Sequence, residues 1–136
     1  MSNEENKALV SLVYDLFKRK EIDAAYEHFT PECVFHMPQG DMSVEQCKDF
    51  DAMFFVAFPD LTLTIEHMVA EGDKVTLREN WKGTHKGEFM GIPPTGNKIE
   101  FTSAVLIKIV SGKWVEFWSV VDRLRLMEQL GVIPKQ

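Results

Sequence analysis

The chain has 136 residues, of which 45% are hydrophobic and 26% charged, and its net charge at pH 7 is −6. This length and composition are typical of one globular domain, so we predict a single domain over residues 1–136 that needs neither a disulfide nor a metal to fold. The acidic balance argues against a nucleic-acid partner, because phosphate groups repel a negatively charged surface.

Cysteine usage and hydropathy indicate the compartment. Cys33 and Cys47 have no metal-binding or redox spacing, and we expect both to be reduced. Residues 1–5 are polar and do not resemble a signal peptide. No window approaches the roughly 18 consecutive apolar residues of a membrane span. The expectation is a cytoplasmic protein without a membrane partner.

Two capping-box patterns predict the starts of two helices. Ser2 and Glu5 have the S-x-x-E spacing and precede apolar residues at helical spacing, which predicts an amphipathic helix over residues 3–19. The same spacing recurs at residues 43–46 and opens another helix, which Pro59 ends.

The segment between these helices is predicted to contain a short helix and a strand. The helix is expected to start at Asp23, to include Phe29 and to end before Pro31, because a proline disfavours helical geometry in the residue before it. The apolar residues 33–37 predict a strand, and residues 39–41 a turn.

The C-terminal half is predicted to form a run of strands. Apolar residues alternate with polar ones, and the turn signals Glu71-Gly72-Asp73 and Ser111-Gly112-Lys113 separate the runs. The predicted strands are residues 61–69, 74–84, 99–110 and 114–121. A short helix is expected at residues 123–130.

This order of elements predicts an α+β fold. We expect a conical, curved antiparallel or mixed sheet with the N-terminal helices packed on its concave face around an apolar pocket. A loop at residues 85–96 is rich in Gly and Pro but also carries Phe89, Met90 and Ile92, so we expect it to pack over another part of the chain. An enclosed apolar pocket is the default site for a small molecule.

Alternation divides the last strand into two faces. One carries Trp114, Glu116, Trp118, Val120 and Asp122, and the other carries Val115, Phe117, Ser119 and Val121. If the first face lines the pocket, Asp122 lies at its rim and Glu116 deeper, where desolvation makes a carboxylate a better proton acceptor. The alternative is that this face is solvated and that Asp122 caps the following helix.

Two histidines are further candidates for acid/base work. His36 lies in the first strand and His85 at the start of the apolar loop; each is either a pocket residue or a structural or solvated histidine. The residues predicted to contact a substrate are Trp81, Phe89, Met90, Trp114, Glu116 and Trp118. No metal-binding spacing and no glycine-rich nucleotide motif is present, so neither a metal nor a cofactor is expected.

Four stretches of the chain, in their order, resemble the SnoaL-like ester cyclases, which are polyketide cyclases of the nuclear-transport-factor-2-like superfamily. They are FPDL at 58–61, EGDKV at 71–75, GTHKGEFMGIPPTG at 83–96, and Trp118 with Asp122 ahead of QLGV at 129–132. The resemblance covers nearly the whole chain, and the long glycine-rich stretch is its most specific part.

The resemblance implies a cofactor-independent enzyme that closes a ring by intramolecular aldol condensation. Asp122 matches the family's acid/base aspartate, which removes a proton from a carbon flanked by carbonyls, and His36 and His85 match its assisting histidines. The family is also similar in fold to ketosteroid isomerases. Glu79-Asn80 departs from the family's pattern, because apolar or small residues are expected before Trp81. The abundance of Phe and Met suits a smaller or more flexible ligand than a polyketide.

Three functions remain open from the sequence. A cyclase or isomerase acting on a small carbonyl compound requires Asp122 to face an open cavity. A non-catalytic small-molecule binding protein requires an open cavity with Asp122 outside it or ion-paired. An interaction module requires a cone filled by side chains such as Trp114, Trp118 and Phe101.

A homodimer is predicted from the second face of the last strand. If Val115, Phe117 and Val121 form an outer apolar face, that patch marks an interface. The alternative is that the helices cover this face.

Overall fold

Four helices and six strands make up the fold within residues 2–135, which are the residues that the computed structural model describes. In chain order they are α1 (Asn3–Lys18), α2 (Ile22–Tyr26), β1 (Phe29–Met37), β2 (Gly40–Met42), α3 (Val44–Ala57), β3 (Thr62–Glu71), β4 (Lys74–Thr84), β5 (Lys98–Val110), β6 (Lys113–Val121) and α4 (Arg123–Gln129). Among these residues, no helix has the length and apolar character that crossing a membrane requires.

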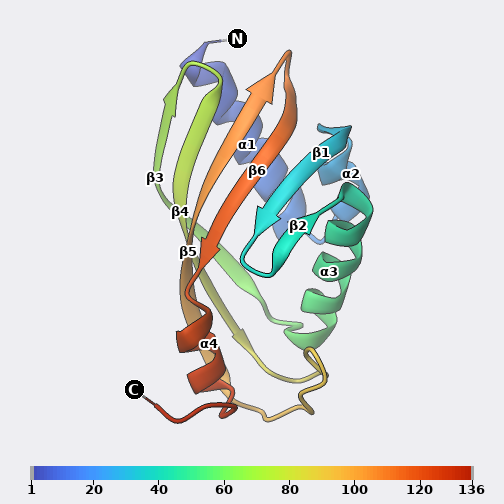
Figure 1. Ribbon diagram of the computed structural model, residues 1–136, viewed down its shortest axis with the longest axis vertical. Helices are drawn as coiled ribbons and strands as arrows, with labels where there is room; N and C mark the ends of the chain where they lie inside the picture. Colours follow the sequence, from blue (N-terminus) through green and yellow to red (C-terminus); the bar gives the residue numbers. More distant parts are fainter. Residues whose placement is uncertain (1, 136) are drawn as a thin grey trace.

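All six strands belong to one mixed, curved sheet in the order β2-β1-β6-β5-β4-β3 (Figure 1). Strands β1 and β6 run parallel, and every other neighbouring pair is antiparallel. The parallel pair joins the N-terminal hairpin to the C-terminal strands, so that His36 lies beside Trp118. This architecture confirms the predicted fold class.

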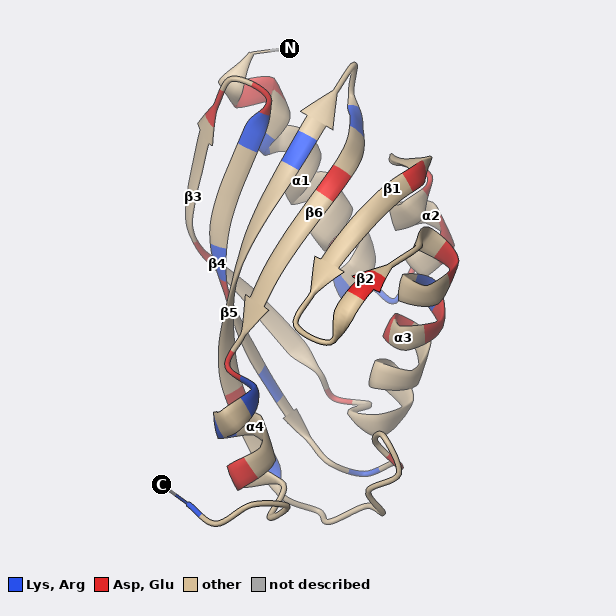
Figure 2. Cartoon of the chain, viewed as in Figure 1, with Lys and Arg blue, Asp and Glu red and all other residues tan. Residues whose placement is uncertain are grey.

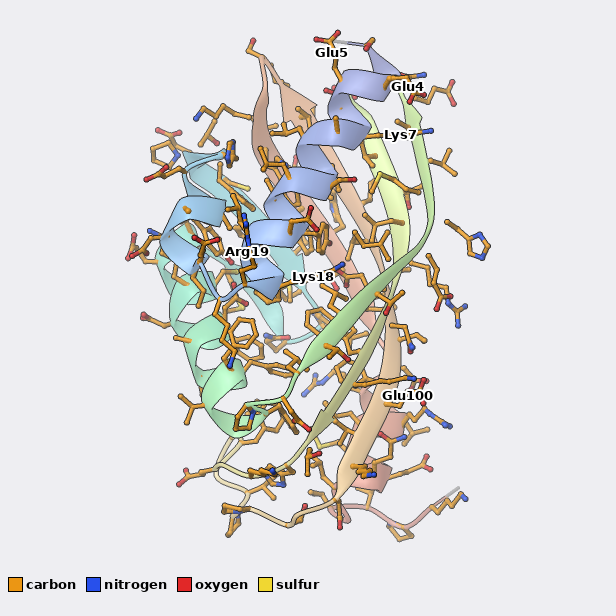
Figure 3. All side chains as sticks on the ribbon, turned by 180° about the vertical axis from the view of Figure 1, so that it is seen from behind. Glu4, Glu5, Lys7, Lys18, Arg19 and Glu100 are labelled. Atoms are coloured by element: carbon orange, nitrogen blue, oxygen red, sulfur yellow. The ribbon has the colours of Figure 1, made fainter. Side chains whose placement is uncertain are left out.

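Helix α1 covers the sheet face that is hidden in Figure 1 and visible in Figure 3. It buries Val10, Val13 and Tyr14 in a core shared with β4 and β5. Figure 3 shows Glu4 and Glu5 at its start and Lys18 and Arg19 at its end, which complements the helix dipole.

The predicted capping boxes are both present. The Ser2 hydroxyl accepts a hydrogen bond from the Glu5 backbone N–H, and the Glu5 carboxylate accepts one from the Ser2 N–H. Ser43 and Gln46 make the equivalent pair at the start of α3. These local patterns fix where both helices begin.

The segment before β1 differs from the prediction. Helix α2 ends at Tyr26, and Phe29 already belongs to β1. The conformation that a proline imposes on its predecessor is extended, so Pro31 extends the strand at residue 30 where the prediction used it to stop a helix. The predicted turn at residues 39–41 is tighter than expected, because Gly40–Met42 pairs back on β1 as β2.

Strand β3 contains a bulge that shifts its alternation. Glu66 pairs with Arg78, but Val69 pairs with Thr76, and His67 has a φ of 56°. After the bulge Met68 packs against the core and Val69 is exposed. Unbroken alternation over the predicted strand 61–69 places Val69 on the same face as Leu63, and this expectation is wrong because a bulge inserts an extra residue into the period of two.

Strand β6 contains a second bulge. Ile109 of β5 pairs with Trp114, while Lys108 pairs with Glu116, so Val115 has no partner across β5. Trp114 faces the concave side and is buried. From residue 116 onward the odd-numbered positions, not the even-numbered ones, share its side of the sheet.

The loop between β4 and β5 packs on the end of α3. The backbone N–H groups of Lys86 and Gly87 both donate to the Ala57 carbonyl, at 3.0 and 3.1 Å. A Cβ at Gly87 would collide with the Val56 carbonyl oxygen and lie 3.1 Å from the Ala57 Cα. Phe89, which belongs to this loop, is buried, as its apolar character predicted.

Gly87→Ala is expected to destabilise the protein by about 1–3 kcal/mol, because the added methyl group meets backbone that cannot swing aside. Urea unfolding of the variant measures this change. The control is Glu88→Ala, at the exposed neighbouring position. Equal midpoints for the two variants would show that the close approach is not required.

Candidate functional site

A cavity of about 180 Å³ lies between the concave face of the sheet and the helices. Its wall is rich in aromatic side chains, among them Tyr14, Tyr26, Phe35, Phe54, Trp81, Phe101, Trp114 and Phe117. Pro38, Gln39, Met90 and Arg123 both line the cavity and are exposed, which places its mouth beside the β1–β2 turn, the 85–97 loop and α4. A dry apolar cavity of roughly 150 Å³ holds benzene, so this one suits a ligand of about one ring.

Four of the six residues predicted to contact substrate line this cavity: Trp81, Phe89, Met90 and Trp114. Glu116 and Trp118 do not, because the bulge in β6 turns them to the convex face. The expectation that Trp114 shares a face with Glu116 and Trp118 is wrong for this reason. The open cavity also argues against an interaction module with a filled cone.

Phe117 and Val121 line the cavity instead of forming an outer apolar patch. The alternative reading of this face, in which the helices cover it, is the correct one. The homodimer stays a prediction, but Phe117 and Val121 do not form the exposed apolar patch on which it was based.

Asp122 stands at the rim of the cavity but is not part of its wall. It is exposed, whereas its neighbours Val121 and Arg123 line the cavity. Its carboxylate accepts a hydrogen bond from the Arg125 backbone N–H at 3.2 Å and caps α4. Asp122 thus lies at the rim, as predicted, and its hydrogen bond is the helix cap of the alternative interpretation. Its catalytic role stays a prediction.

His36 lies on the convex face, away from the cavity. Its Nε2 is 2.6 Å from a Glu116 carboxylate oxygen and its Nδ1 is 2.8 Å from one of Asp41. Its ring stacks on Trp118, with 5.2 Å between centroids. Hydrogen bonds to Glu116 and then Asp41 raise its pKa above the usual 6.5. The ring thus links β1, β2 and β6.

His85, the first residue of the 85–97 loop, is fully buried and does not line the cavity. Its Nδ1 accepts a hydrogen bond from the Thr95 backbone N–H at 3.2 Å and lies 2.9 Å from the Thr95 hydroxyl. Its ring packs on Phe58. These contacts position the loop, and an acid/base role for His85 stays a prediction.

Asp51 of α3 brings a carboxylate to the cavity wall. The Tyr26 hydroxyl donates a hydrogen bond to it at 2.6 Å. Part of its surface remains accessible because it borders the cavity, but protein atoms surround it on the other sides. This burial raises the pKa of Asp51 to about 7; the Tyr26 hydrogen bond opposes the rise and the charge of Glu79 adds to it.

Glu79 of β4 brings a second carboxyl group to the same cavity. It is 4% exposed, and the Ser103 hydroxyl donates to its Oε1. The indole N–H of Trp81 donates to the Ser103 hydroxyl oxygen at 3.0 Å, and the Tyr14 hydroxyl also hydrogen-bonds to Glu79. Burial raises the pKa of Glu79 above its usual value.

The sequence contained a signal for both carboxyl groups. Glu79 lies in register with Val75 and Leu77 on the apolar face of β4, where a charged residue needs an explanation. Asp51 follows Cys47 by four residues and precedes Phe54 by three, so it occupies the buried stripe of α3. A carboxylate on an apolar face was thus the sequence signal that could have identified the wall of the cavity.

Acidic residues predominate around the cavity. Figure 2 shows acidic residues gathered on α2 and α3. Within residues 2–135 neither Asp51 nor Glu79 has an ion pair, and no group of His, Cys, Asp and Glu is arranged to hold a metal ion. Arg123 at the mouth is the cation that lines the cavity in this part of the chain. Anionic ligands are therefore disfavoured in the interior.

The sequence profile of the SnoaL-like polyketide cyclases matches residues 7–130. The chain belongs to the SnoaL-like polyketide cyclase family. Membership supports a cyclase-type function in general terms. A comparison with curated proteins finds no match.

Three solved structures are similar over nearly the whole chain. AclR, a proposed hydroxylase from Streptomyces galilaeus, is 32% identical with a TM-score of 0.92, covering 99% of this chain and 86% of its own. IdmH, a proposed polyketide cyclase from Streptomyces antibioticus, is 29% identical with a TM-score of 0.82, covering 93% and 98%. A proposed SnoaL-like polyketide cyclase from Jannaschia Sp. CCS1 is 25% identical with a TM-score of 0.87, covering 97% and 95%.

His36 is expected to make stability depend on pH. Because its pKa is raised in the folded protein, its contribution is fully present below pH 6.5, the unfolded value, and is lost as the pH rises through the folded value. His36→Gln should abolish this loss in urea unfolding across that range. His67→Asn, at an exposed position with positive φ, is the control. An unchanged pH profile in His36→Gln would refute the assignment.

Asp51→Asn is expected to stabilise the protein above neutral pH. The raised pKa means that ionising Asp51 costs folded-state stability progressively between pH 3.8 and about 7. The amide removes this cost, so its free energy of unfolding should exceed that of the wild type by roughly 2–4 kcal/mol at alkaline pH and match it in acid. The exposed Asp49 on the same helix supplies the control, Asp49→Asn. Parallel profiles for wild type and Asp51→Asn would show that Asp51 is not desolvated.

Proposed function

We propose that this protein is a cofactor-independent acid/base enzyme that removes a proton from a carbon next to a carbonyl group and so cyclises or isomerises a small substrate. The observation that carries the proposal is Asp51, a carboxylate on the wall of an apolar cavity with a pKa of about 7. A general base works best when its pKa lies near the working pH. Membership of a polyketide cyclase family agrees with this chemistry.

Asp51 is better placed than Asp122 for the role of base. Asp51 borders the enclosed space, whereas Asp122 is exposed and capped onto α4. Tyr26 holds the Asp51 carboxylate in one orientation through its 2.6 Å hydrogen bond. A fixed base on the wall of an apolar cavity needs little reorganisation during proton transfer.

The cavity restricts the substrate. Its volume suits about one ring with short substituents, and its wall is aromatic. Two carboxyl groups without a cationic partner disfavour an anionic molecule. We therefore propose an uncharged carbonyl compound, smaller than a multi-ring polyketide, that becomes negative only when the proton leaves.

A non-catalytic binding protein is the second function to test. One observation favours it. The cavity is open and Asp122 lies outside it, which is the arrangement expected of a binding protein if Asp122 is the base. Asp51, however, places a different base on the cavity wall, so the position of Asp122 alone does not exclude catalysis.

The decisive experiment follows hydrogen–deuterium exchange at the methyl group of acetophenone, an uncharged ketone, in D₂O by NMR. We expect the wild type to accelerate exchange and Asp51→Asn to lose about 10²-fold or more of that acceleration. Asp122→Asn, a matched change at the rim, should retain it. Loss in Asp122→Asn with retention in Asp51→Asn would return the role to Asp122. Binding of the compound without any acceleration would establish the binding protein.

A further inference from the structure

The hydrogen bonds around Glu79 distinguish its two oxygens. An indole N–H is a donor only, so the Ser103 hydroxyl oxygen must accept from Trp81. The Ser103 hydrogen is then free to point at Glu79 Oε1, the acceptor that contacts it. Oε1 is therefore occupied as an acceptor, and a proton carried by Glu79 belongs on Oε2.

The charge balance around Glu79 favours the protonated form. Its surroundings are hydroxyl and indole groups from Tyr14, Ser103 and Trp81, none of which carries a positive charge. A buried carboxyl group without a counter-ion binds a proton in preference to staying charged. Burial raises its pKa, and the Tyr14 hydroxyl donates its own hydrogen to Glu79 and so does not take up the hydrogen that Glu79 carries.

The two carboxyl groups of the cavity have different settings. Asp51 projects from α3, keeps some accessible surface and accepts from Tyr26, whereas Glu79 lies at the sheet and is almost fully buried. They are near enough for the charge of one to act on the other. Carboxyl groups whose environments differ in this way divide the roles of acid and base.

We propose that Glu79 is a carboxylic acid that donates a hydrogen bond from Oε2 to the carbonyl oxygen of the substrate, opposite the base Asp51. This rests on the proposed function and assigns the substrate's orientation within it. The carbonyl oxygen lies toward β4 and β5, and the acidic carbon lies toward α3.

The reaction step balances without any other reactant. The Asp51 carboxylate takes the proton from carbon, and the C–H electron pair forms the C=C bond of an enolate whose oxygen carries the charge. The Glu79 O–H stabilises that oxygen by a hydrogen bond. In a cyclisation the enolate carbon then bonds to a second carbonyl carbon of the same molecule, and Asp51 returns its proton to the new alkoxide.

The assignment explains the substrate preference at the level of one atom. A ligand with a carbonyl oxygen satisfies the Glu79 donor, whereas a hydrocarbon of the same shape leaves a buried donor without its partner. Such a loss weakens binding by about tenfold. The cavity should therefore distinguish acetophenone from ethylbenzene, which has the same carbon skeleton but no oxygen.

The test measures binding of acetophenone and ethylbenzene to the wild type, Glu79→Gln and Glu79→Leu by calorimetry. The Gln amide keeps an acceptor for Ser103 and a donor for the ligand, so we expect it to retain the tenfold preference for acetophenone. Glu79→Leu should lose it. Loss of the preference in Glu79→Gln, or no preference in the wild type, would overturn the proposal. Urea unfolding checks that both variants are folded.

Infrared spectroscopy provides a readout that requires no ligand. At neutral pH Asp51→Asn should still show the carbonyl stretch of a protonated carboxyl group, because Glu79 supplies it, and this band should vanish in the double variant Asp51→Asn/Glu79→Gln. A spectrum in which Glu79→Gln removes only a carboxylate band would overturn the proposal.

The exchange assay separates this proposal from the proposed function. We expect Glu79→Gln to stay within about tenfold of the wild type and Glu79→Leu to fall by about 10²-fold. If Glu79→Gln instead loses all exchange and Asp51→Asn keeps it, the acid and base are reversed and the assignment fails while the enzyme survives. If the wild type accelerates no exchange, the proposed function fails, and the binding and infrared results still decide the state of Glu79.

Discussion

The extra residue in β6 decides which chemistry the cavity contains. Val115 has no partner on β5, so Trp114 and Phe117 both face the helices while Glu116 faces out. Without this bulge the interior would receive Glu116 and the exterior Phe117. The bulge therefore leaves the last strand to supply apolar wall, and the acid/base groups come from α3 and β4. A bulge that re-aims side chains beside a site is a recurrent device in sheets.

Desolvation is the force that gives those two carboxyl groups their properties. Asp51 and Glu79 face aromatic rings and hydroxyl groups, which hold them in place but do not neutralise them. Keeping both in the cavity lowers stability at neutral pH, since each is held away from water without a cation. Groups that reduce stability in this way are typical of functional sites, where reactivity depends on the same desolvation.

The convex face carries a separate polar cluster with a mechanical consequence. His36 joins Glu116 of β6 to Asp41 of β2. The turn between β1 and β2 contributes Pro38 and Gln39 to the mouth of the cavity. The histidine that the family resemblance implied for catalysis thus holds the hairpin at the entrance from the opposite side of the sheet, and its charge state bears on the stability of that hairpin.

The sequence by itself determined the α+β class, the family and the two capped helices, because these depend on composition, short motifs and local hydrogen bonds. Its pattern also places Glu79 and Asp51 as charged residues on apolar faces, a signal that they line a cavity. Only the tertiary structure decided which face of β6 lines the cavity and that Asp122 caps α4. Alternation predicts sides only while the register is unbroken, and a bulge is fixed by pairing between strands, which one strand's sequence does not record.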